Sequence, residues 1–157
     1  SNDHTERGHE QEPIARMIYE EQYFATVTNG GFFDCGLYGD SPDGLIDSDG
    51  VLEVKTMVSS DTLFTAVADG DISAYLDQCN GYLWLLGRQW VDLVLWAPDL
   101  EALGLSMTIH RITRDETAIE ALESDLMKFA ALVNGYEQSL RSAALRTAHA
   151  QLTGIAA

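Results

Sequence analysis

The stretch SPDGLIDSDGVLEVKT, residues 41–56, carries Asp43, Glu53 and Lys55 within thirteen positions. Two carboxylates suit a hard cation such as Mg²⁺, which prefers oxygen ligands and keeps several waters. The carbonyl of Val54 is a further candidate ligand. A lysine beside such an ion can orient or deprotonate a water and neutralise a phosphate. The stretch therefore predicts a metal site for phosphodiester hydrolysis, with Glu53 and Lys55 near solvent.

The position of Asp43 depends on how the chain turns between the two apolar pieces of this stretch. A three-residue loop over residues 48–50, with its glycine in the left-handed conformation, pairs Asp43 with Lys55. All three charged residues, Glu53 included, then share one face of a hairpin, because side chains alternate with period two. A two-residue turn at 49–50 shifts the register and moves Asp43 off that face. We favour the first register because it groups the charges, although the sequence permits both.

A plainer interpretation of the same stretch needs no site. Pro-Asp-Gly is ordinary turn chemistry, and Glu-x-Lys is common on a half-exposed strand. Short motifs of this kind match by chance, so the surrounding sequence has to decide.

Hydrophobic periodicity and turn residues indicate the elements that position these side chains. The expected elements are a helix over residues 9–27, an antiparallel meander over 31–56, a short helix ending near 68, a helix over 71–86, strands over 91–96 and 105–112, and a long helix from an Asp115 cap to about 152. This order is that of a mixed α/β or α+β domain.

Composition bounds the class of protein. The 157 residues suffice for one domain with a real core, and 46% are apolar, which excludes global disorder. The formal net charge of −16 argues against simple electrostatic wrapping of DNA, but it allows a nuclease whose basic groups line only a channel. Cys35 and Cys79 have no disulfide or metal spacing. No apolar run of about 18 residues is present, so we expect no membrane span.

Three blocks along the chain carry a resemblance to a known family. They are RGHEQEPIAR at residues 7–16, SPDGLID with LEVK between 41 and 55, and SAYLDQCNGYLW at 73–84. Their order and spacing are similar to those of the phage lambda exonuclease-like viral recombinase family, a branch of the PD-(D/E)XK nucleases. The resemblance extends from about residue 7 to residue 100, and three ordered blocks are far more specific than one motif.

The resemblance implies roles for the charged residues. The family's metal-binding aspartate falls on Asp43, its second carboxylate on Glu53 and its catalytic lysine on Lys55. Its helix glutamate, which supports a second metal ion, falls on Glu12 because this residue lies four positions after a glycine. Glu10 is the nearby competitor and fits less well.

Three further residues are assigned to the site. The resemblance places the family's active-site glutamine on Gln78, with Tyr75 one helical turn before it as a substrate contact. Arg16 is a candidate phosphate contact from the first block, although single arginines are more often solvated or paired with a carboxylate.

The resemblance also implies a fold and an activity. The fold is a restriction-endonuclease-like core with a central mixed sheet flanked by helices. The activity is Mg²⁺-dependent 5′→3′ digestion of one strand of double-stranded DNA from its ends, with Mn²⁺ as a possible substitute. Family members often form toroidal homotrimers and work with a single-strand annealing protein, so we expect a phage or prophage protein acting in the bacterial cytoplasm.

One departure from the family concerns the start of the chain. The family has an upstream segment in which a Trp, an Arg and a Ser help to hold the 5′ end, and this sequence begins after that point. We therefore expect a single nuclease domain over residues 1–157 without the family's N-terminal segment.

Two other functions remain open on the sequence alone. An endonuclease of the same superfamily would share the metal site. A non-catalytic acidic binding module on a nuclease-like fold would explain the charge of −16. A decayed site should have lost one of its charged residues, and none of Glu12, Asp43, Glu53 and Lys55 is lost.

Overall fold

A five-stranded mixed sheet forms the centre of the computed structural model, which describes residues 2–154. The strands lie in the order β1-β4-β5-β6-β7, and only β5 and β6 are parallel. Their bounds are β1 (Val27–Thr28), β4 (Gly44–Ile46), β5 (Gly50–Thr56), β6 (Trp90–Trp96) and β7 (Met107–Thr113). A separate antiparallel pair joins β2 (Phe33–Asp34) and β3 (Gly39–Asp40). The mixed α/β class predicted from the sequence is confirmed.

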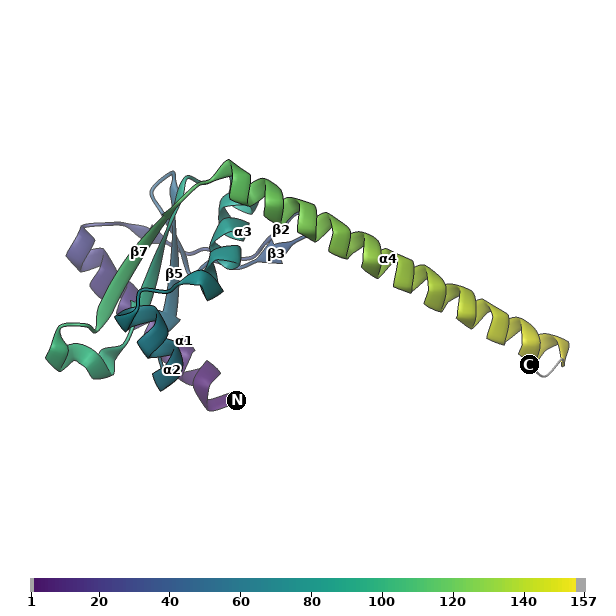
Figure 1. The fold of residues 1–157 in the computed structure, drawn as a ribbon, viewed down its shortest axis with the longest axis horizontal. Coiled ribbons are helices and arrows are strands. Elements are labelled where there is room, and N and C mark those ends of the chain that lie inside the picture. Colours follow the sequence, from purple (N-terminus) through teal and green to yellow (C-terminus); the bar gives the residue numbers. More distant parts are fainter. Residues whose placement is uncertain (1, 155–157) are drawn as a thin grey trace. The chain divides into compact units, whose positions relative to one another are not determined.

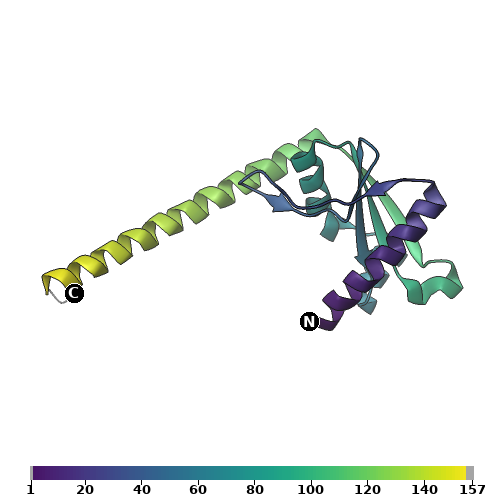
Figure 2. The same ribbon diagram turned by 180° about the vertical axis from the view of Figure 1, so that it is seen from behind.

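Helices cover both faces of the central strands. The helices are α1 (Asn2–Tyr23), α2 (Ser60–Leu63), α3 (Leu76–Leu86) and α4 (Glu116–Thr153), with a π-helical turn at Phe64–Ala68 and 3₁₀ turns at Ser73–Tyr75 and Pro98–Leu103. Alternate residues of β6 enter two hydrophobic clusters, one including Cys79 and Leu83 of α3, the other Ala15 and Tyr19 of α1. Figures 1 and 2 show α1 and α3 on opposite sides of the sheet. Two buried faces explain why β6 reads as a nearly continuous apolar run.

The first helix departs from its predicted bounds. It ends at Tyr23, and Phe24 takes a left-handed φ of 51°. The chain then forms the short edge strand β1, where the Val27 amide donates to Glu20 Oε1 at 2.8 Å and Arg16 donates to the Val27 carbonyl. Two residues are too short for a periodic signal, so the sequence does not predict this strand.

The hairpin of β4 and β5 has a register that differs from both registers considered from the sequence. Leu45 pairs with Val51 and Ile46 pairs with Gly50, so the loop is residues 47–49. Asp47, not the glycine, takes the left-handed φ of 45°. The register favoured from the sequence was therefore wrong by two positions. A shift of two residues leaves every side chain on its original face of the sheet, so the predicted common face of the charged residues is retained.

Contacts from β6 and its preceding turn explain this register. A Cβ on Gly50 would lie 2.3 Å from the Trp90 ring, so the glycine is needed inside the strand rather than in the turn. The Asp49 carbonyl accepts from the Gln89 amide at 2.8 Å. Arg88 donates to the carbonyls of Asp47 and Gly50 at 3.1 and 2.7 Å. The hairpin is closed by residues distant in sequence.

The last helix was predicted correctly. The Asp115 carboxylate accepts from the amides of Thr117 and Ala118, which satisfies the free donors of the first turn. The chain divides by its contacts into two compact units, with a boundary at Leu122 inside α4. In the second unit large apolar side chains of the helix are exposed, among them Phe129, Leu132, Tyr136 and Leu140. Within the described residues, no helix is long and apolar enough to cross a membrane.

A buried carboxylate joins α1 to the sheet. Asp92 is 2% exposed and accepts from the Tyr19 hydroxyl at 2.6 Å and from Arg111 at 2.7 and 2.8 Å, and Arg111 also lies over the Trp90 ring. Removing Arg111 leaves this buried charge with one donor. We expect Arg111→Ala to lower the free energy of unfolding by about 2 kcal/mol, measured by urea denaturation.

The matched control for this prediction is Arg141→Ala. Arg141 pairs with Glu137 on α4, and both side chains are exposed. Such pairs contribute about 0.5 kcal/mol or less. Equal losses in the two variants would show that the Asp92 pair has no special weight in the fold.

Candidate active site

Strand β5 places Glu53 and Lys55 on the face that α3 covers. Their side chains point the same way because they are two residues apart on a strand. The Lys55 ammonium lies 2.6 Å from Glu53 Oε1. Glu53 is 3% exposed, whereas 28% of the Lys55 side chain is exposed. The prediction that both groups lie near solvent is wrong for Glu53, because Tyr82 and α3 cover it.

Asp43 reaches the same place from the segment before β4. Its Oδ2 accepts from the Val54 amide at 2.7 Å, so the aspartate is tied to the strand that carries the other two residues. The prediction that Asp43, Glu53 and Lys55 lie together is therefore consistent with the structure, although the register that motivated it is not.

A cavity of about 260 Å³ brings these residues together with α1. It is lined by Gly8, His9, Glu12, Asp43, Glu53, Val54, Lys55 and Thr56. Of the two glutamates considered from the sequence, Glu12 lines the cavity, whereas Glu10 is exposed and does not. A Cβ on Gly8 would meet no atom within 4 Å, so the side of the cavity beside α1 is open.

Burial and mutual repulsion dominate the electrostatics of the two central carboxylates. Burial raises the pKa of Asp43 to about 6, and the negative charge of Glu12 acts in the same direction against the Val54 hydrogen bond. Burial likewise raises the pKa of Glu53 to about 7, with the charge of Asp43 adding to it and Lys55 opposing it. The positive charge of Lys55 therefore offsets the burial and the mutual repulsion of the two carboxylates only in part.

Lys55 is held by two acceptors. Its ammonium donates to Glu53 and to Gln78 Oε1, the latter at 2.8 Å. Burial lowers the pKa of Lys55, but the charge of Glu53, the hydrogen bond to it and the charge of Asp43 together outweigh burial and leave the pKa above its usual value. Lys55 is therefore a cation in this arrangement, able to neutralise a phosphate or orient a water. The bond to Lys55 brings Gln78 to the edge of the same site.

The donor set fits a hard divalent cation in its chemistry. Glu12, Asp43 and Glu53 offer only oxygen ligands, and such ligands are those Mg²⁺ prefers. Across residues 2–154, however, no three His, Cys, Asp or Glu side chains are already placed to hold one ion. Lys55 and Tyr82 also occupy the two oxygens of Glu53. Binding an ion requires these side chains to exchange partners.

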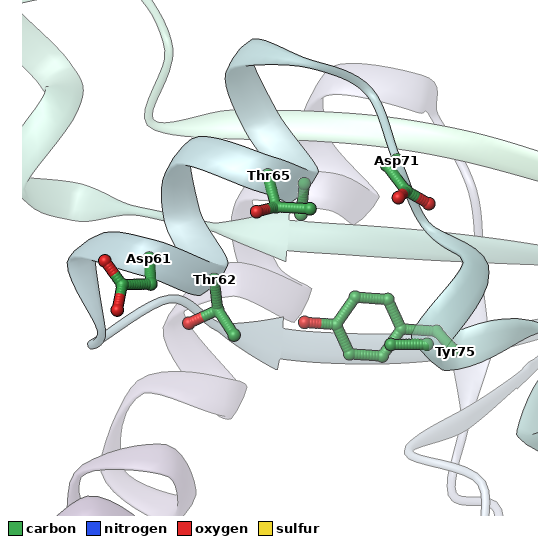
Figure 3. A pocket seen from close by; sticks show the side chains of 7 residues that line it. Asp61, Thr62, Thr65, Asp71 and Tyr75 are labelled. Atoms are coloured by element: carbon green, nitrogen blue, oxygen red, sulfur yellow. The ribbon is translucent and has the colours of Figure 1, made fainter.

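Two predicted substrate contacts lie outside this cavity. Arg16 donates a hydrogen bond to Asn29 Oδ1, just after β1, at 3.0 Å, and it does not line the cavity. Tyr75 lines a different hollow of about 190 Å³, whose polar lining is Asp61, Thr62, Thr65 and Asp71. Figure 3 shows the Tyr75 hydroxyl pointing across this hollow toward Thr62. Neither residue is brought to the carboxylates.

Tyr82 is a site residue that the sequence analysis missed. It is fully buried, and its hydroxyl lies 2.8 Å from both Glu53 Oε2 and Gln78 Nε2. The available signal was its spacing, because Gln78 and Tyr82 are four residues apart and so share one face of a helix. A tyrosine on an apolar helix face is, however, more typical of core packing.

Known proteins resemble this chain in sequence and in fold. A family model described as the YqaJ-like viral recombinase domain matches residues 1–89, which include all three sequence blocks. An alkaline exonuclease from Laribacter hongkongensis, LHK-Exo, is 28% identical with a TM-score of 0.83, over 92% of this chain and 75% of that one. The structure of LHK-Exo in complex with dAMP is 29% identical to this chain with a TM-score of 0.85, over 94% of this chain and 76% of that one.

A more distant structure shares the fold alone. A phage-related exonuclease from Haemophilus somnus 129PT is 16% identical with a TM-score of 0.69, over 88% of this chain and 73% of that one. No curated protein matches the chain.

Proposed function

The chain belongs to the YqaJ-like viral recombinase family, as its three sequence blocks predicted, and we propose that it is a Mg²⁺-dependent exonuclease that digests double-stranded DNA 5′→3′ from its ends. One observation carries this proposal most directly. Asp43, Glu53 and Lys55 meet in one cavity with Glu12, and this residue set suits metal-dependent hydrolysis of a phosphodiester. The similarity to LHK-Exo, an alkaline exonuclease, supports a nuclease role.

The positions of the residues support a role for each of them. Asp43, Glu53 and Glu12 would hold the ion, with the Val54 carbonyl as a further ligand. A divalent cation bound there would supply a water of lowered pKa and stabilise charge on the phosphate. Lys55 stays protonated, neutralises a phosphate oxygen and orients the attacking water. Gln78 fixes Lys55 through the 2.8 Å bond to its ammonium. Mn²⁺ is expected to substitute, since it takes the same oxygen ligands.

The net charge shapes how DNA is held. A chain with a charge of −16 cannot attract DNA over its whole surface. Within the described residues Arg88, Arg111 and Arg114 are engaged by carbonyls or carboxylates of the fold, which leaves few cations for phosphate contacts. We infer that binding depends on the bound cation and on Lys55, because Arg16 is likewise engaged by the fold and Tyr75 lines a different hollow.

We further propose a homotrimer that works with a single-strand annealing protein in recombination. This extension rests on the family resemblance. The exposed apolar side chains of α4 support it. Phe129, Leu132, Tyr136 and Leu140 are spaced three or four residues apart and so share one face of the helix, and exposed apolar patches mark interaction sites. Sedimentation equilibrium gives the mass directly, and a monomer at micromolar concentration would refute the trimer.

One experiment tests the nuclease proposal. Linear duplex DNA labelled at either strand end, and a closed circular duplex, are incubated with the protein in Mg²⁺ or in EDTA. We expect Mg²⁺-dependent loss from the 5′ ends with the circle intact. Cutting of the circle would instead establish an endonuclease. Binding of DNA without cleavage of either substrate would favour a non-catalytic module.

A further inference from the structure

A closed ring of hydrogen bonds surrounds the centre of the site. Glu53 Oε1 accepts from Lys55 at 2.6 Å, and Lys55 donates to Gln78 Oε1 at 2.8 Å. Gln78 Nε2 and the Tyr82 hydroxyl are 2.8 Å apart, and that hydroxyl is 2.8 Å from Glu53 Oε2. Two residues on the same face of β5 are thus connected through two residues of α3. Tyr82 is the only one of the four without a role in the function proposed above.

The donors and acceptors of this ring have one consistent arrangement. An ionised carboxylate only accepts, so the single Tyr82 proton is donated to Glu53. The hydroxyl oxygen is then left to accept from the Gln78 amide. This fixes the amide with its oxygen toward the Lys55 ammonium, because the reversed amide would face two donors toward each other. The orientation of Gln78, and with it the position of Lys55, therefore depends on the Tyr82 hydroxyl.

The position of Tyr82 itself is fixed by packing. Its side chain is 0% exposed and belongs to the hydrophobic cluster between the sheet and α3. Its hydroxyl lies 3.5 Å from the Ser41 carbonyl, in the segment that leads to Asp43. A rigid phenol that touches three segments of the site is suited to hold their relative positions, as partners of ligating carboxylates do in metal sites.

We infer that Tyr82 is a positioning residue for both halves of the site, holding Glu53 for the cation and, through Gln78, Lys55 for the phosphate. This inference rests on the proposed function. Tyr82 bonds one carboxylate oxygen of Glu53, and the other, Oε1, is the one that Lys55 contacts. Oε2 of Glu53 therefore stays bonded to Tyr82 while Oε1 exchanges Lys55 for the cation.

The test is Tyr82→Phe, which removes one oxygen and keeps the ring. We expect the affinity for Mg²⁺, measured by calorimetry on the full chain without DNA, to fall about 10-fold or more. Turnover of duplex DNA should fall as well, even at saturating Mg²⁺, because Gln78 no longer fixes Lys55. A purely structural role would lower the melting temperature and leave the Mg²⁺ affinity unchanged.

The matched control is Tyr19→Phe. Tyr19 is equally buried, and its hydroxyl donates to the Asp92 carboxylate at 2.6 Å on the other face of the sheet. We expect this variant to lose stability while its Mg²⁺ affinity stays at the wild-type value. An equal loss of Mg²⁺ affinity in both variants would overturn the inference, since a general loosening of the fold would then explain it.

A second variant separates the effect of Tyr82 on Glu53 from its effect on Lys55. It tests the inference even if Tyr82→Phe folds poorly. Gln78→Met removes the bonds to Lys55 and Tyr82 but leaves the bond from Tyr82 to Glu53. We expect turnover to fall, whereas the Mg²⁺ affinity should stay within about 2-fold of the wild-type value. Wild-type affinity and turnover in both variants would overturn the inference while leaving the nuclease proposal intact. A wild-type chain that neither binds Mg²⁺ nor cleaves DNA would overturn both.

Discussion

Replacing Lys55 with alanine is expected to reduce Mg²⁺-dependent cleavage of linear duplex DNA by at least about 100-fold while the fold persists. Lys55 is the one cation lining the cavity whose side chain is held there by two acceptors, Glu53 and Gln78. Its loss removes the positive charge that balances phosphate and the donor that orients the water. Initial rates on end-labelled DNA measure the effect, and circular dichroism checks the fold.

The chain offers a close control for this variant. Lys128 is the other lysine of the sequence, and it forms an exposed ion pair with Asp125 on α4. Lys128→Ala changes the net charge equally and should leave cleavage within about 2-fold of wild type. Normal turnover in Lys55→Ala would refute the role assigned to this lysine. Equal losses in both variants would point to overall charge as the cause.

The choice of a variant at Glu53 depends on the burial of this side chain. Glu53 is 3% exposed, so truncation to alanine would leave a cavity and an unpaired Tyr82 hydroxyl. Glu53→Gln keeps the volume and an acceptor for Tyr82 while removing the charge. It separates loss of the ligand from loss of the fold, which the alanine variant cannot do.

The face on which the charged residues lie was predictable, whereas their register was not. Side chains alternate along a strand whatever the strand pairs with, so Glu53 and Lys55 had to share a face. The register depends on Gly50 lying against the Trp90 ring and on Arg88 binding the turn carbonyls. These contacts come from a distant part of the sequence, and local turn preferences pointed instead to a left-handed Gly50.

The same limit explains the missed tyrosine. Tyr82 sits on the apolar face of α3 next to Leu83 and Cys79, and by composition it is indistinguishable from a core residue. Only the approach of β5 shows that its hydroxyl meets a carboxylate. Helix signals, by contrast, are local, and the Asp115 cap and the left-handed Gly87 at the end of α3 were both predictable.

Burial of the site carboxylates, with their mutual repulsion added to it, has a testable consequence for stability. The pKa of Asp43 is raised to about 6 in the folded chain, from 3.8 in the absence of structure. A raised carboxyl pKa means that the folded state binds the proton more tightly than the unfolded state. Stability therefore falls as the pH rises from about 4 through 6, and the full penalty is present at pH 8.

Replacing Asp43 with asparagine should remove this penalty. In EDTA at pH 8 we expect Asp43→Asn to be more stable than wild type by about 1–3 kcal/mol, since each pKa unit corresponds to about 1.4 kcal/mol. The asparagine oxygen can still accept from the Val54 amide. The difference should shrink toward zero near pH 4, where Asp43 is protonated. Chemical denaturation at several pH values measures it.

Mg²⁺ should reverse the order of the two proteins. A cation that binds the folded state stabilises it by mass action, and the wild-type chain, with all its carboxylates, gains more than the variant. Asp47→Asn is the control, because Asp47 is an exposed aspartate of the same hairpin and its replacement changes the net charge equally. If Asp43→Asn were less stable than wild type in EDTA at pH 8, the buried charge of Asp43 would not destabilise the fold in the way that we expect the cation to relieve. We expect Mg²⁺ to reverse the order of stability of wild type and Asp43→Asn, but not that of wild type and Asp47→Asn. That result would connect the destabilising charge of the buried carboxylates to the cation binding that the proposed function requires.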